Sequence, residues 1–359
     1  MSAAIGTICV RCSELVAAPA EGALCAACGA RLRALLSARA GTRRTGRSSH
    51  RWQLGTSIAV ALLVSGVVLL RQASVGVDAR PAHVGQWIGF GSTSFISPVG
   101  LAQDRTGNVY VVDAATHHIY KLAPDGSLLA TFGSHGTAAG QFERPTAIAL
   151  DGIGNLYVAD TANSRIQKLS STGVPLATWG SYGTAPGQFN GPRGVAVDHE
   201  GNVYVADTGS DRIQKLSPLG HVMATWGRPG QGGGEFRQPY GVSLDADGAV
   251  YVADHWNNRI QKLSAAGVPQ GEWGGFGSAA GLFNNPRSVV VDGHGDVYVA
   301  DSFNHRIQKL SPAGVPLAEW GGRGGQLGQF RRPEGLVVDD AGRMVVVDAD
   351  NDRLQRYVP

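Results

Sequence analysis

The side chains with the clearest chemistry are four cysteines near the start of the chain. They form two Cys-x-x-Cys pairs separated by twelve residues, Cys9 with Cys12 and Cys25 with Cys28. Each pair lets a tight turn present two thiolates to one ion, and two pairs complete the tetrahedral sulfur shell that zinc prefers. The alternatives are two disulfides, which need an oxidising compartment, or a redox-active pair, which is typical of thioredoxin-like folds. We predict one structural zinc ion in a zinc-ribbon-like segment over residues 1–38.

A second set of polar side chains occupies one recurring position, directly after a proline. The prolines follow one another at intervals of 47 residues, and the residue after the proline is of five different types in the six copies. Arginine pairs with carboxylate or phosphate through its planar fork, and tyrosine adds a flat surface. We expect this position to bind an anionic or polar group, the alternative being that an exposed position varies freely. The six residues are Val99, Thr146, Arg193, Tyr240, Arg287 and Glu334.

A third set lies in short turns whose sequences also differ between copies. Histidine and aromatic residues stand out there, and exposed aromatic residues near a concave surface are candidate binding groups. Ordinary loop variation is the alternative interpretation. The residues are His117, His255, Trp256, Phe303 and His305.

Both of these sets are positioned by a repeat that runs from residue 98 to the end of the chain. Each copy has four short apolar segments separated by turns, as in GVAVD, NVYVAD, RIQKLS and HVMATWG of the third copy. Four strands make one blade, and repetition of blades around an axis makes a β-propeller, in which each sheet buries both faces. The six copies begin at Pro98, Pro145, Pro192, Pro239, Pro286 and Pro333.

The propeller arrangement places the two variable sets on one face. The strand after each proline starts at the entrance of the central channel, and the turns between second and third strands open on the same side. We therefore expect Thr146, Arg193, Tyr240, Arg287 and Glu334 at the channel mouth, with the histidine and aromatic set in the loops around it.

The repeat resembles the NHL repeat, whose blades end their first two strands in aspartate and begin the third with Arg-Ile-Gln. Arg353-Leu-Gln keeps this pattern loosely, and the first copy has His118-Ile-Tyr instead. The resemblance covers nearly all of residues 83–359 and implies an all-β, six-bladed NHL-type propeller there. The matching arginines are Arg165, Arg212, Arg259 and Arg306.

Residues that obey the period are predicted to build the fold. The repeated tryptophans and phenylalanines are packing residues, and the repeated aspartates are turn and strand-end partners for the repeated arginines rather than calcium ligands. The sixth copy stops before its fourth strand, whereas GQWIGFG at residues 85–91 matches that strand. We predict that it pairs with the last blade and covers the open edge.

An uncharged segment, LGTSIAVALLVSGVVLL at residues 54–70, precedes the repeats. At 1.5 Å per residue it spans roughly 26 Å, which suits a bilayer core of about 30 Å. A signal peptide or a buried core helix is less suitable, because the leading segment is too long for the first and a propeller has no place for the second. We predict a transmembrane helix over residues 53–71, between a basic linker at 39–52 and a linker at 72–82.

Charge sets the predicted orientation and argues against one class of partner. Five arginines precede the span closely and two follow, so the N-terminus is predicted to be cytoplasmic and the propeller extracytoplasmic, in a single-pass protein of the cell membrane. Residues 1–82 hold 10 Arg against three acidic residues, or +7, and the remainder holds 21 basic against 25 acidic residues, or −4. A mildly acidic propeller is not expected to bind nucleic acid.

The predicted architecture resembles the sensor portion of bacterial receptor-type serine/threonine kinases, but the sequence carries no kinase signature. Related amidating lyases and lactonase-type propellers hold a metal in the channel with histidine and carboxylates, whereas this mouth offers one glutamate and no histidine. We expect a membrane-anchored, extracytoplasmic binding or sensing protein with no catalytic residues. Its partners would be a protein, peptide or glycan ligand and, through the helix, membrane lipid. A propeller enzyme, lyase or lactonase-like hydrolase, and a structural or adhesive scaffold are the alternatives.

Overall fold

The computed structural model describes residues 7–8, 15–16, 82–90 and 93–358 of the chain. The chain divides into two compact units, Met1–Val75 and Gly76–Pro359. In the first unit, β1 (Thr7–Ile8) pairs antiparallel with β2 (Leu15–Val16). The predicted zinc ligands lie outside the described residues, so the zinc ribbon stays a prediction. They are Cys9, Cys12, Cys25 and Cys28.

The predicted transmembrane helix over residues 53–71 also lies outside the described residues and stays a prediction. Across the ranges that the structure describes, no helix is long and apolar enough to cross a membrane. All the candidate ligand-binding residues belong to the second unit.

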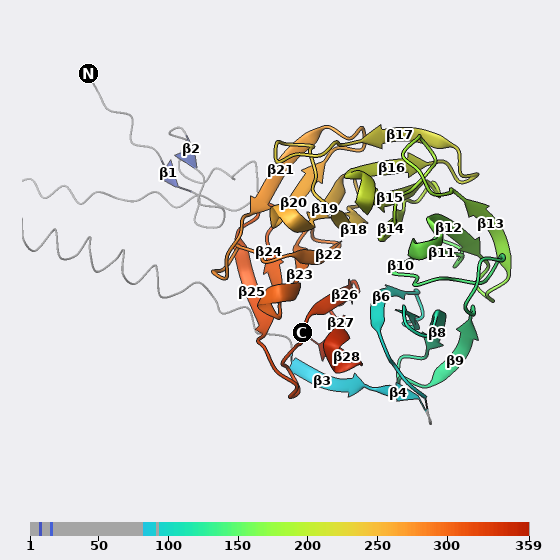
Figure 1. Cartoon of the computed structure of the whole chain (residues 1–359). Coiled ribbons are helices and arrows are strands. Elements are labelled where there is room, and N and C mark those ends of the chain that lie inside the picture. The colour runs from blue at the N-terminus through green and yellow to red at the C-terminus, as the bar shows by residue number, and fades with distance from the viewer. Residues whose placement is uncertain (1–6, 9–14, 17–81, 91–92, 359) are drawn as a thin grey trace, which may run out of the picture. The chain divides into compact units, whose positions relative to one another are not determined.

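The described part of the second unit forms six four-stranded antiparallel sheets, arranged as blades around a central axis (Figure 1). This confirms the predicted all-β, six-bladed propeller. Blade 1 contains β6 (Pro98–Gln103), β7 (Val109–Asp113), β8 (His118–Leu122) and β9 (Leu128–Phe132). Blade 2 contains β10 (Ala147–Leu150), β11 (Leu156–Asp160), β12 (Arg165–Leu169) and β13 (Pro175–Trp179). Blade 3 contains β14 (Gly194–Val197), β15 (Val203–Asp207), β16 (Arg212–Leu216) and β17 (Val222–Trp226).

The second half of the ring repeats this pattern. Blade 4 contains β18 (Pro239–Leu244), β19 (Val250–Asp254), β20 (Arg259–Leu263) and β21 (Pro269–Gly274). Blade 5 contains β22 (Pro286–Val291), β23 (Val297–Asp301), β24 (Arg306–Leu310) and β25 (Pro316–Gly321). Blade 6 contains β26 (Pro333–Val338), β27 (Met344–Asp348), β28 (Arg353–Val358) and, from the other end of the unit, β3 (Ala82–Trp87).

The second strand of every blade is buried along its whole length because neighbouring blades pack against both faces of its sheet. All five residues of β15 are buried, although its sequence Val-Tyr-Val-Ala-Asp does not alternate. Side chains from adjacent blades share one cluster, as where Tyr157 of blade 2 packs with Val203 of blade 3. The periodic Phe189 is fully buried in this cluster and Trp179 packs against it, so both are packing residues as the sequence predicts.

The aspartate that ends each second strand lies fully buried and holds the connection between neighbouring blades. Asp207 accepts hydrogen bonds of 2.7 Å from the backbone N–H of Asn190 and from Arg212 Nε. Arg212 also donates to three backbone carbonyls of that connection. Asp198, which follows the first strand, holds the next turn by accepting from the backbone N–H of Asn202 at 2.8 Å. The repeated aspartates are therefore turn and strand-end partners, as predicted.

The ring closes through β3, which pairs antiparallel with β28 and supplies the fourth strand of blade 6. The predicted closure is thereby confirmed, although the strand ends at Trp87 rather than continuing to residue 91. Beyond it Gly89 adopts φ 147°, a conformation rarely open to residues with a side chain, and β4 (Gly89–Phe90) pairs instead with β5 (Thr93–Ser94). The Arg356 side chain lies over the Trp87 ring of the closing strand, with its guanidinium carbon 5.0 Å from the ring centroid.

In blades 2 to 6 a single 3-10 turn links the second strand to the third. Each turn follows the buried aspartate and is followed by a residue in the left-handed conformation. The turns lie on the face that is towards the viewer in Figure 1. They are η1 (Thr161–Asn163), η2 (Thr208–Ser210), η3 (His255–Asn257), η4 (Ser302–Asn304) and η5 (Ala349–Asn351).

Candidate ligand-binding site

The first strands of all six blades surround a central channel, where the described residues line a cavity of about 310 Å³. The residue after each proline lies at one end of this channel, because the proline pairs with the buried aspartate that precedes the 3-10 turn, as Pro239 does with Asp254. We call this ring of six residues the channel mouth. It consists of Val99, Thr146, Arg193, Tyr240, Arg287 and Glu334.

Neighbouring first strands approach closely because small residues follow the mouth positions. A Cβ atom on Gly194 would lie 2.1 Å from the carbonyl oxygen of Tyr240, and one on Gly241 would lie 2.7 Å from that of Arg287. Only glycine tolerates such backbone contact. The close approach allows side chains from blades 3, 4 and 5 to meet at the mouth.

Tyr240 is the centre of the cationic side of the mouth. The guanidinium carbon of Arg193 lies 4.9 Å from the centre of the Tyr240 ring, and that of Arg287 lies 5.2 Å from it. The His255 ring is also close, at 4.7 Å between centroids. Cation–π attraction therefore helps to hold two arginine side chains at one place.

The two arginines differ in their carboxylate partners. Arg287 Nη1 forms an ion pair with Glu334, and Arg332 Nε lies 3.2 Å from the same carboxylate oxygen. Arg332 Nη2 also pairs with Asp350 at 2.7 Å. Arg193, by contrast, is half-buried and forms no ion pair with a carboxylate of the described residues. The mouth thus contains one guanidinium that no carboxylate of that part of the chain contacts directly.

Glu334 forms ion pairs with two neighbouring arginines. Its side chain is only 10% exposed, and its Oε1 atom faces both Arg287 and Arg332. Burial raises the pKa of the Glu334 carboxyl above its ordinary value, although Arg287, Arg332 and Arg193 oppose that rise. A carboxylate held in this way pairs directly with Arg287 and Arg332, whereas Arg193 acts on it only through its charge.

The mouth is less polar where blades 1 and 2 contribute to it. Val99 carries no polar atom, and the Thr146 hydroxyl lies 2.6 Å from the Thr161 hydroxyl and 3.1 Å from the carbonyl oxygen of Arg193. Thr146 therefore makes its contacts within the propeller. The structure places Thr146 at the mouth, but its hydroxyl already forms hydrogen bonds with other groups of the propeller.

His255 lies beneath the mouth, with only 5% of its surface exposed, and not in an open loop. Its Nδ1 atom is 3.2 Å from the carbonyl oxygen of Pro286, so this nitrogen must carry the proton. Burial and the neighbouring Arg287 lower the pKa of His255 to about 4, which keeps the ring neutral near pH 7. Thr208 occupies the same place in blade 3 and donates to the equivalent proline carbonyl. His255 thus performs a repeated structural contact and also supports Tyr240.

The other two histidines of the variable turns accept hydrogen bonds from backbone N–H groups. His117 and His305 adopt φ values of 60° and 57°, and their Nδ1 atoms accept the backbone N–H groups of Arg144 and Arg332 at 3.0 and 3.1 Å. Asp211 makes the same contact with its carboxylate in blade 3. The structure therefore gives both histidines a role in joining blades.

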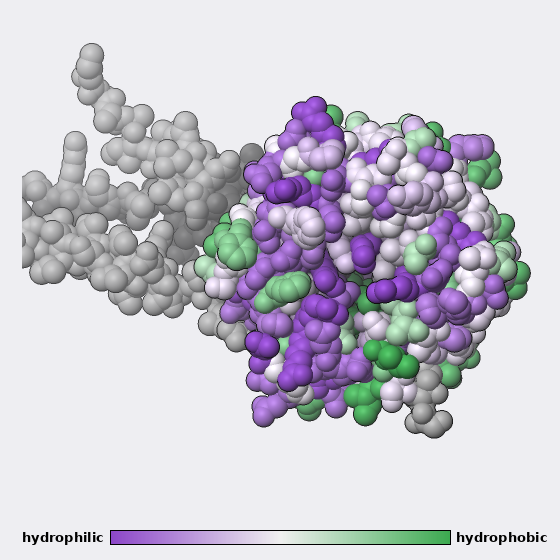
Figure 2. Space-filling view, viewed as in Figure 1, coloured by the Kyte–Doolittle hydropathy of each residue, from purple (hydrophilic) through white to green (hydrophobic). Residues whose placement is uncertain are grey.

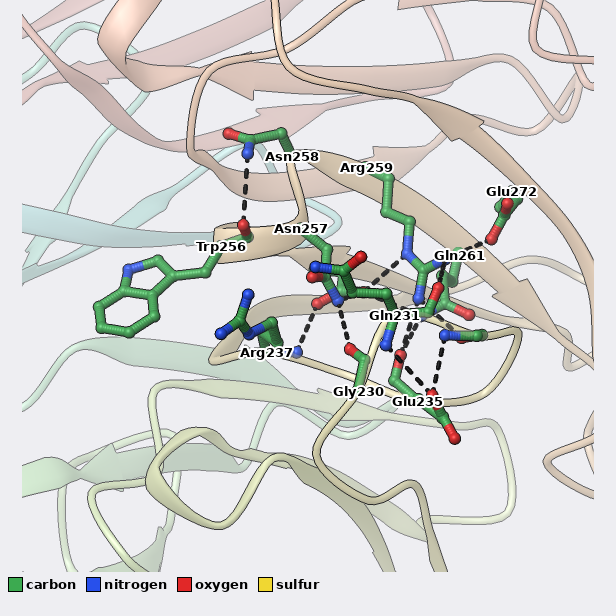
Figure 3. Close-up of polar contacts among 12 residues, drawn as sticks. Gly230, Gln231, Glu235, Arg237, Trp256, Asn257, Asn258, Arg259, Gln261 and Glu272 are labelled. Carbon is green, nitrogen blue, oxygen red and sulfur yellow. Dashed lines mark hydrogen bonds and ion pairs between the residues drawn. The ribbon is translucent and has the colours of Figure 1, made fainter.

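The two aromatic residues of the turns are more exposed. Phe303 is 48% exposed, and the guanidinium carbon of Arg287 lies 5.9 Å from its ring, so it belongs to the rim of the mouth. Trp256 is 54% exposed. In Figure 3 its indole points away from the hydrogen bonds that anchor η3, in which Arg259 and Asn257 reach the connection before blade 4.

Two residues of the site were missed in the sequence. Arg332 and Asp350 belong to the charge network of the mouth, yet neither follows a proline by one residue. Arg332 precedes Pro333 and has φ 50°, as Arg144 and Gln238 precede their own prolines with positive φ. A comparison of the residue before each proline would have drawn attention to it.

The face that carries the mouth is uneven in polarity. Figure 2 shows hydrophilic residues concentrated over blades 5 and 6, and atoms of hydrophobic residues within the central hollow. Over the ranges that the structure describes, no three His, Cys, Asp or Glu side chains group in a way that could hold a metal ion.

Three segments of the chain, residues 189–216, 236–263 and 283–310, match the family described as NHL repeat. The chain carries NHL repeats. They lie in the consecutive blades 3, 4 and 5, and the structure continues the same architecture around the ring of this NHL propeller. No curated protein sequence matches the chain.

Solved structures share the propeller fold at low sequence identity. A streptogramin B lyase is 16% identical, with a TM-score of 0.56 over 77% of this chain and 87% of that chain. A gluconolactonase from Xanthomonas campestris is 14% identical, with a TM-score of 0.57 over 79% of this chain and 92% of that chain. A Bacteroides thetaiotaomicron protein of unknown function is 16% identical, with a TM-score of 0.58 over 76% of each chain. At these identities the likeness shows the fold alone.

Proposed function

We propose that this NHL propeller is a binding protein that holds an anionic group of its ligand at the channel mouth, between Arg193 and Tyr240. The observation that carries the proposal is the half-buried guanidinium of Arg193, which lies on the Tyr240 ring without a carboxylate partner in the described chain. Partial burial of a cation costs free energy unless an anion compensates it. A ligand carboxylate or phosphate would supply that compensation with charge-assisted hydrogen bonds.

The charge of the mouth favours a ligand with a single negative charge. Arg193, Arg287 and Arg332 contribute three positive charges, and Glu334 and Asp350 contribute two negative ones, which leaves +1. His255 adds none near pH 7 because its ring is neutral. The exposed Phe303 and Trp256 rings would extend the contact surface beyond the anionic group.

We also propose the cellular setting that the sequence predicts. The propeller would lie outside the cytoplasm, anchored by the predicted helix over residues 53–71, and would present its mouth to a protein, peptide or glycan. A role like that of the sensor propellers of receptor-type kinases would follow from this arrangement. Two of the similar structures are those of enzymes, a lyase and a gluconolactonase. They share only the fold with this chain, and the binding function is proposed from the mouth residues.

The test is to apply the purified full-length protein to an array of peptides and glycans with and without carboxylate groups. We expect retention of carboxylate-bearing members by the wild type and loss of that retention in Arg193→Ala. Arg228→Ala is the matched control, because its side chain is 79% exposed and pairs with Glu235 away from the mouth. Equal retention by the wild type and Arg193→Ala would refute the proposal.

A further inference from the structure

Blade 6 departs from the repeat at one buried position. The first five blades carry a tyrosine as the second residue of their second strand, and none of these tyrosines is more than 5% exposed. They are Tyr110, Tyr157, Tyr204, Tyr251 and Tyr298. Blade 6 has Val345 at the same place in β27. A phenol ring that the other blades bury is therefore absent from this position of blade 6.

The repeat surrounds each tyrosine ring with a defined set of neighbours, as blade 3 illustrates. The Lys215 ammonium lies 4.9 Å from the centre of the Tyr204 ring, and the Trp226 ring is 6.0 Å away between centroids. The Tyr204 hydroxyl donates a hydrogen bond of 3.2 Å to Asp198, and the ring packs with Val250 of the next blade. Blades 2 and 4 repeat the contacts with lysine, tryptophan and aspartate. The fold thus builds a place for a phenol from a cation, an aromatic ring, a carboxylate and an apolar wall.

Blade 6 keeps this set of neighbours although it lacks the tyrosine. The carboxylate, the cation and the aromatic ring are Asp339, Arg356 and Trp87. All three line a cavity of about 140 Å³, together with Val345 and with Val109, the equivalent valine of blade 1. A cavity of roughly 150 Å³ is large enough for a benzene-sized ring. The missing side chain therefore leaves room for a ring of the same size.

The cavity offers such a ring a hydrogen-bond acceptor and a route from solvent. The Oδ2 atom of Asp339 accepts from Arg343 Nε at 2.6 Å, and a carboxylate oxygen has a second lone pair for a hydroxyl. The Arg343 side chain is 60% exposed and lines the cavity, which therefore reaches the surface. Arg356 lies 5.0 Å from the centre of the Trp87 ring, so its cation can also attract the face of a second ring.

We propose that the cavity between blades 6 and 1 is a second ligand site, which takes a phenol ring with its hydroxyl towards Asp339. The ring belongs either to a free small phenol or to a tyrosine side chain of a partner. The site is separate from the mouth, since Glu334 lies at the start of β26 and Asp339 follows its end. It therefore does not depend on the proposed anion binding.

Ligand-observed NMR on the full-length protein tests the site with 4-methylphenol, toluene and benzoate as probes. We expect 4-methylphenol to bind, and toluene to bind roughly tenfold more weakly because it lacks the hydroxyl. Benzoate should also bind more weakly, since its carboxylate would face the Asp339 carboxylate. Equal binding of toluene and 4-methylphenol would overturn the contact with Asp339. Tighter binding of benzoate would overturn the phenol assignment.

Val345→Tyr is the matched variant, because it restores the residue of the other five blades. We expect it to fold, to melt no lower than the wild type and to lose 4-methylphenol binding. Retained binding in folded Val345→Tyr would overturn the proposal. Arg193→Ala should bind 4-methylphenol as the wild type does, so a failure of the anion site and a failure of this site are distinguishable.

Tyr251→Val makes the reverse change in blade 4, where Asp245, Lys262 and Trp273 remain. Equilibrium dialysis should find one more bound 4-methylphenol than in the wild type, and the ligand should raise the melting temperature of this variant more than that of the wild type. No additional bound molecule would mean that these neighbours do not make a phenol site, and would overturn the inference.

A final probe, N-acetyltyrosinamide, distinguishes the two sources of the ring. Binding as strong as that of 4-methylphenol would identify a tyrosine side chain of a partner as the occupant. Binding of 4-methylphenol alone would identify a free small phenol.

Discussion

Two arginines of the blade 3 region have opposite surroundings. Arg212 recurs with the repeat, is 11% exposed and is fixed by the buried Asp207 and three backbone carbonyls. Arg193 lies at a position whose residue type varies among the blades, is half-buried and rests on Tyr240 without an ion-paired carboxylate among the described residues. The first arginine has its partners inside the fold, whereas under the proposed function the second receives its anion from a ligand. In a repeat protein, periodic residues build the ring and aperiodic residues on one face are available for function.

The largest effect is expected from the strand that closes the ring. Deletion of residues 82–87 from the full chain removes β3 and exposes the edge of β28 together with apolar surface between blades 6 and 1. We expect loss of the cooperative melting transition and aggregation. Thermal melting followed by tryptophan fluorescence measures this, and an unchanged transition would show that the ring does not depend on β3.

The second largest loss of stability is expected when the periodic Arg212 is replaced. Arg212→Ala leaves the fully buried Asp207 carboxylate without its cation, which costs about 3–5 kcal/mol of unfolding free energy. Chemical denaturation measures the loss, with Arg228→Ala as the exposed control, expected within about 0.5 kcal/mol of wild type. A loss below 1 kcal/mol in Arg212→Ala would mean that the periodic network is not what holds the blades together.

His255 should make stability depend on pH. Its pKa is lowered to about 4 in the folded protein, compared with about 6.5 in an unfolded chain, so the unfolded state binds more protons between these values. The free energy of unfolding contributed by this group is therefore full above pH 6.5 and falls as the pH decreases towards 4, by roughly 3 kcal/mol at most.

The matched variant is His255→Thr, which restores the residue type found at Thr161 and Thr208. Denaturation of the wild type and of His255→Thr between pH 4 and 7 should show a steeper pH dependence for the wild type. Identical profiles would mean that the imidazole is not kept neutral by its surroundings.

Most of the framework could be predicted from the sequence because each structural role recurs with the period. The blade count, the packing of Phe189 and Trp179, and the partnership of Asp207 with Arg212 all follow from positions that repeat every 47 residues. The closing strand was found in the same way, since Trp87 stands where the other blades have their fourth-strand aromatic residue. Its end at Trp87 follows the fourth strands of blades 1 to 3, which end at the equivalent Phe132, Trp179 and Trp226.

The site was harder to predict because the residue types that make its contacts change from blade to blade, although several of the contacts recur. The sequence located the mouth, but it did not show that His255 is buried under Tyr240 or that His117 and His305 accept backbone N–H groups. Arg332 was missed because it precedes Pro333, whereas the candidate mouth residues follow their prolines.

The most direct test of the central claim compares Arg193→Ala with the wild type in two measurements on the same full-length samples. We predict that the melting temperature hardly changes, because the change in unfolding free energy should stay within about 0.5 kcal/mol. The affinity for the carboxylate-bearing ligand should fall by roughly ten- to a hundredfold, because a charge-assisted contact worth about 1.5–3 kcal/mol is lost. An unchanged affinity, or a loss of stability as large as that of Arg212→Ala, would contradict the distinction between a periodic frame and an aperiodic binding mouth.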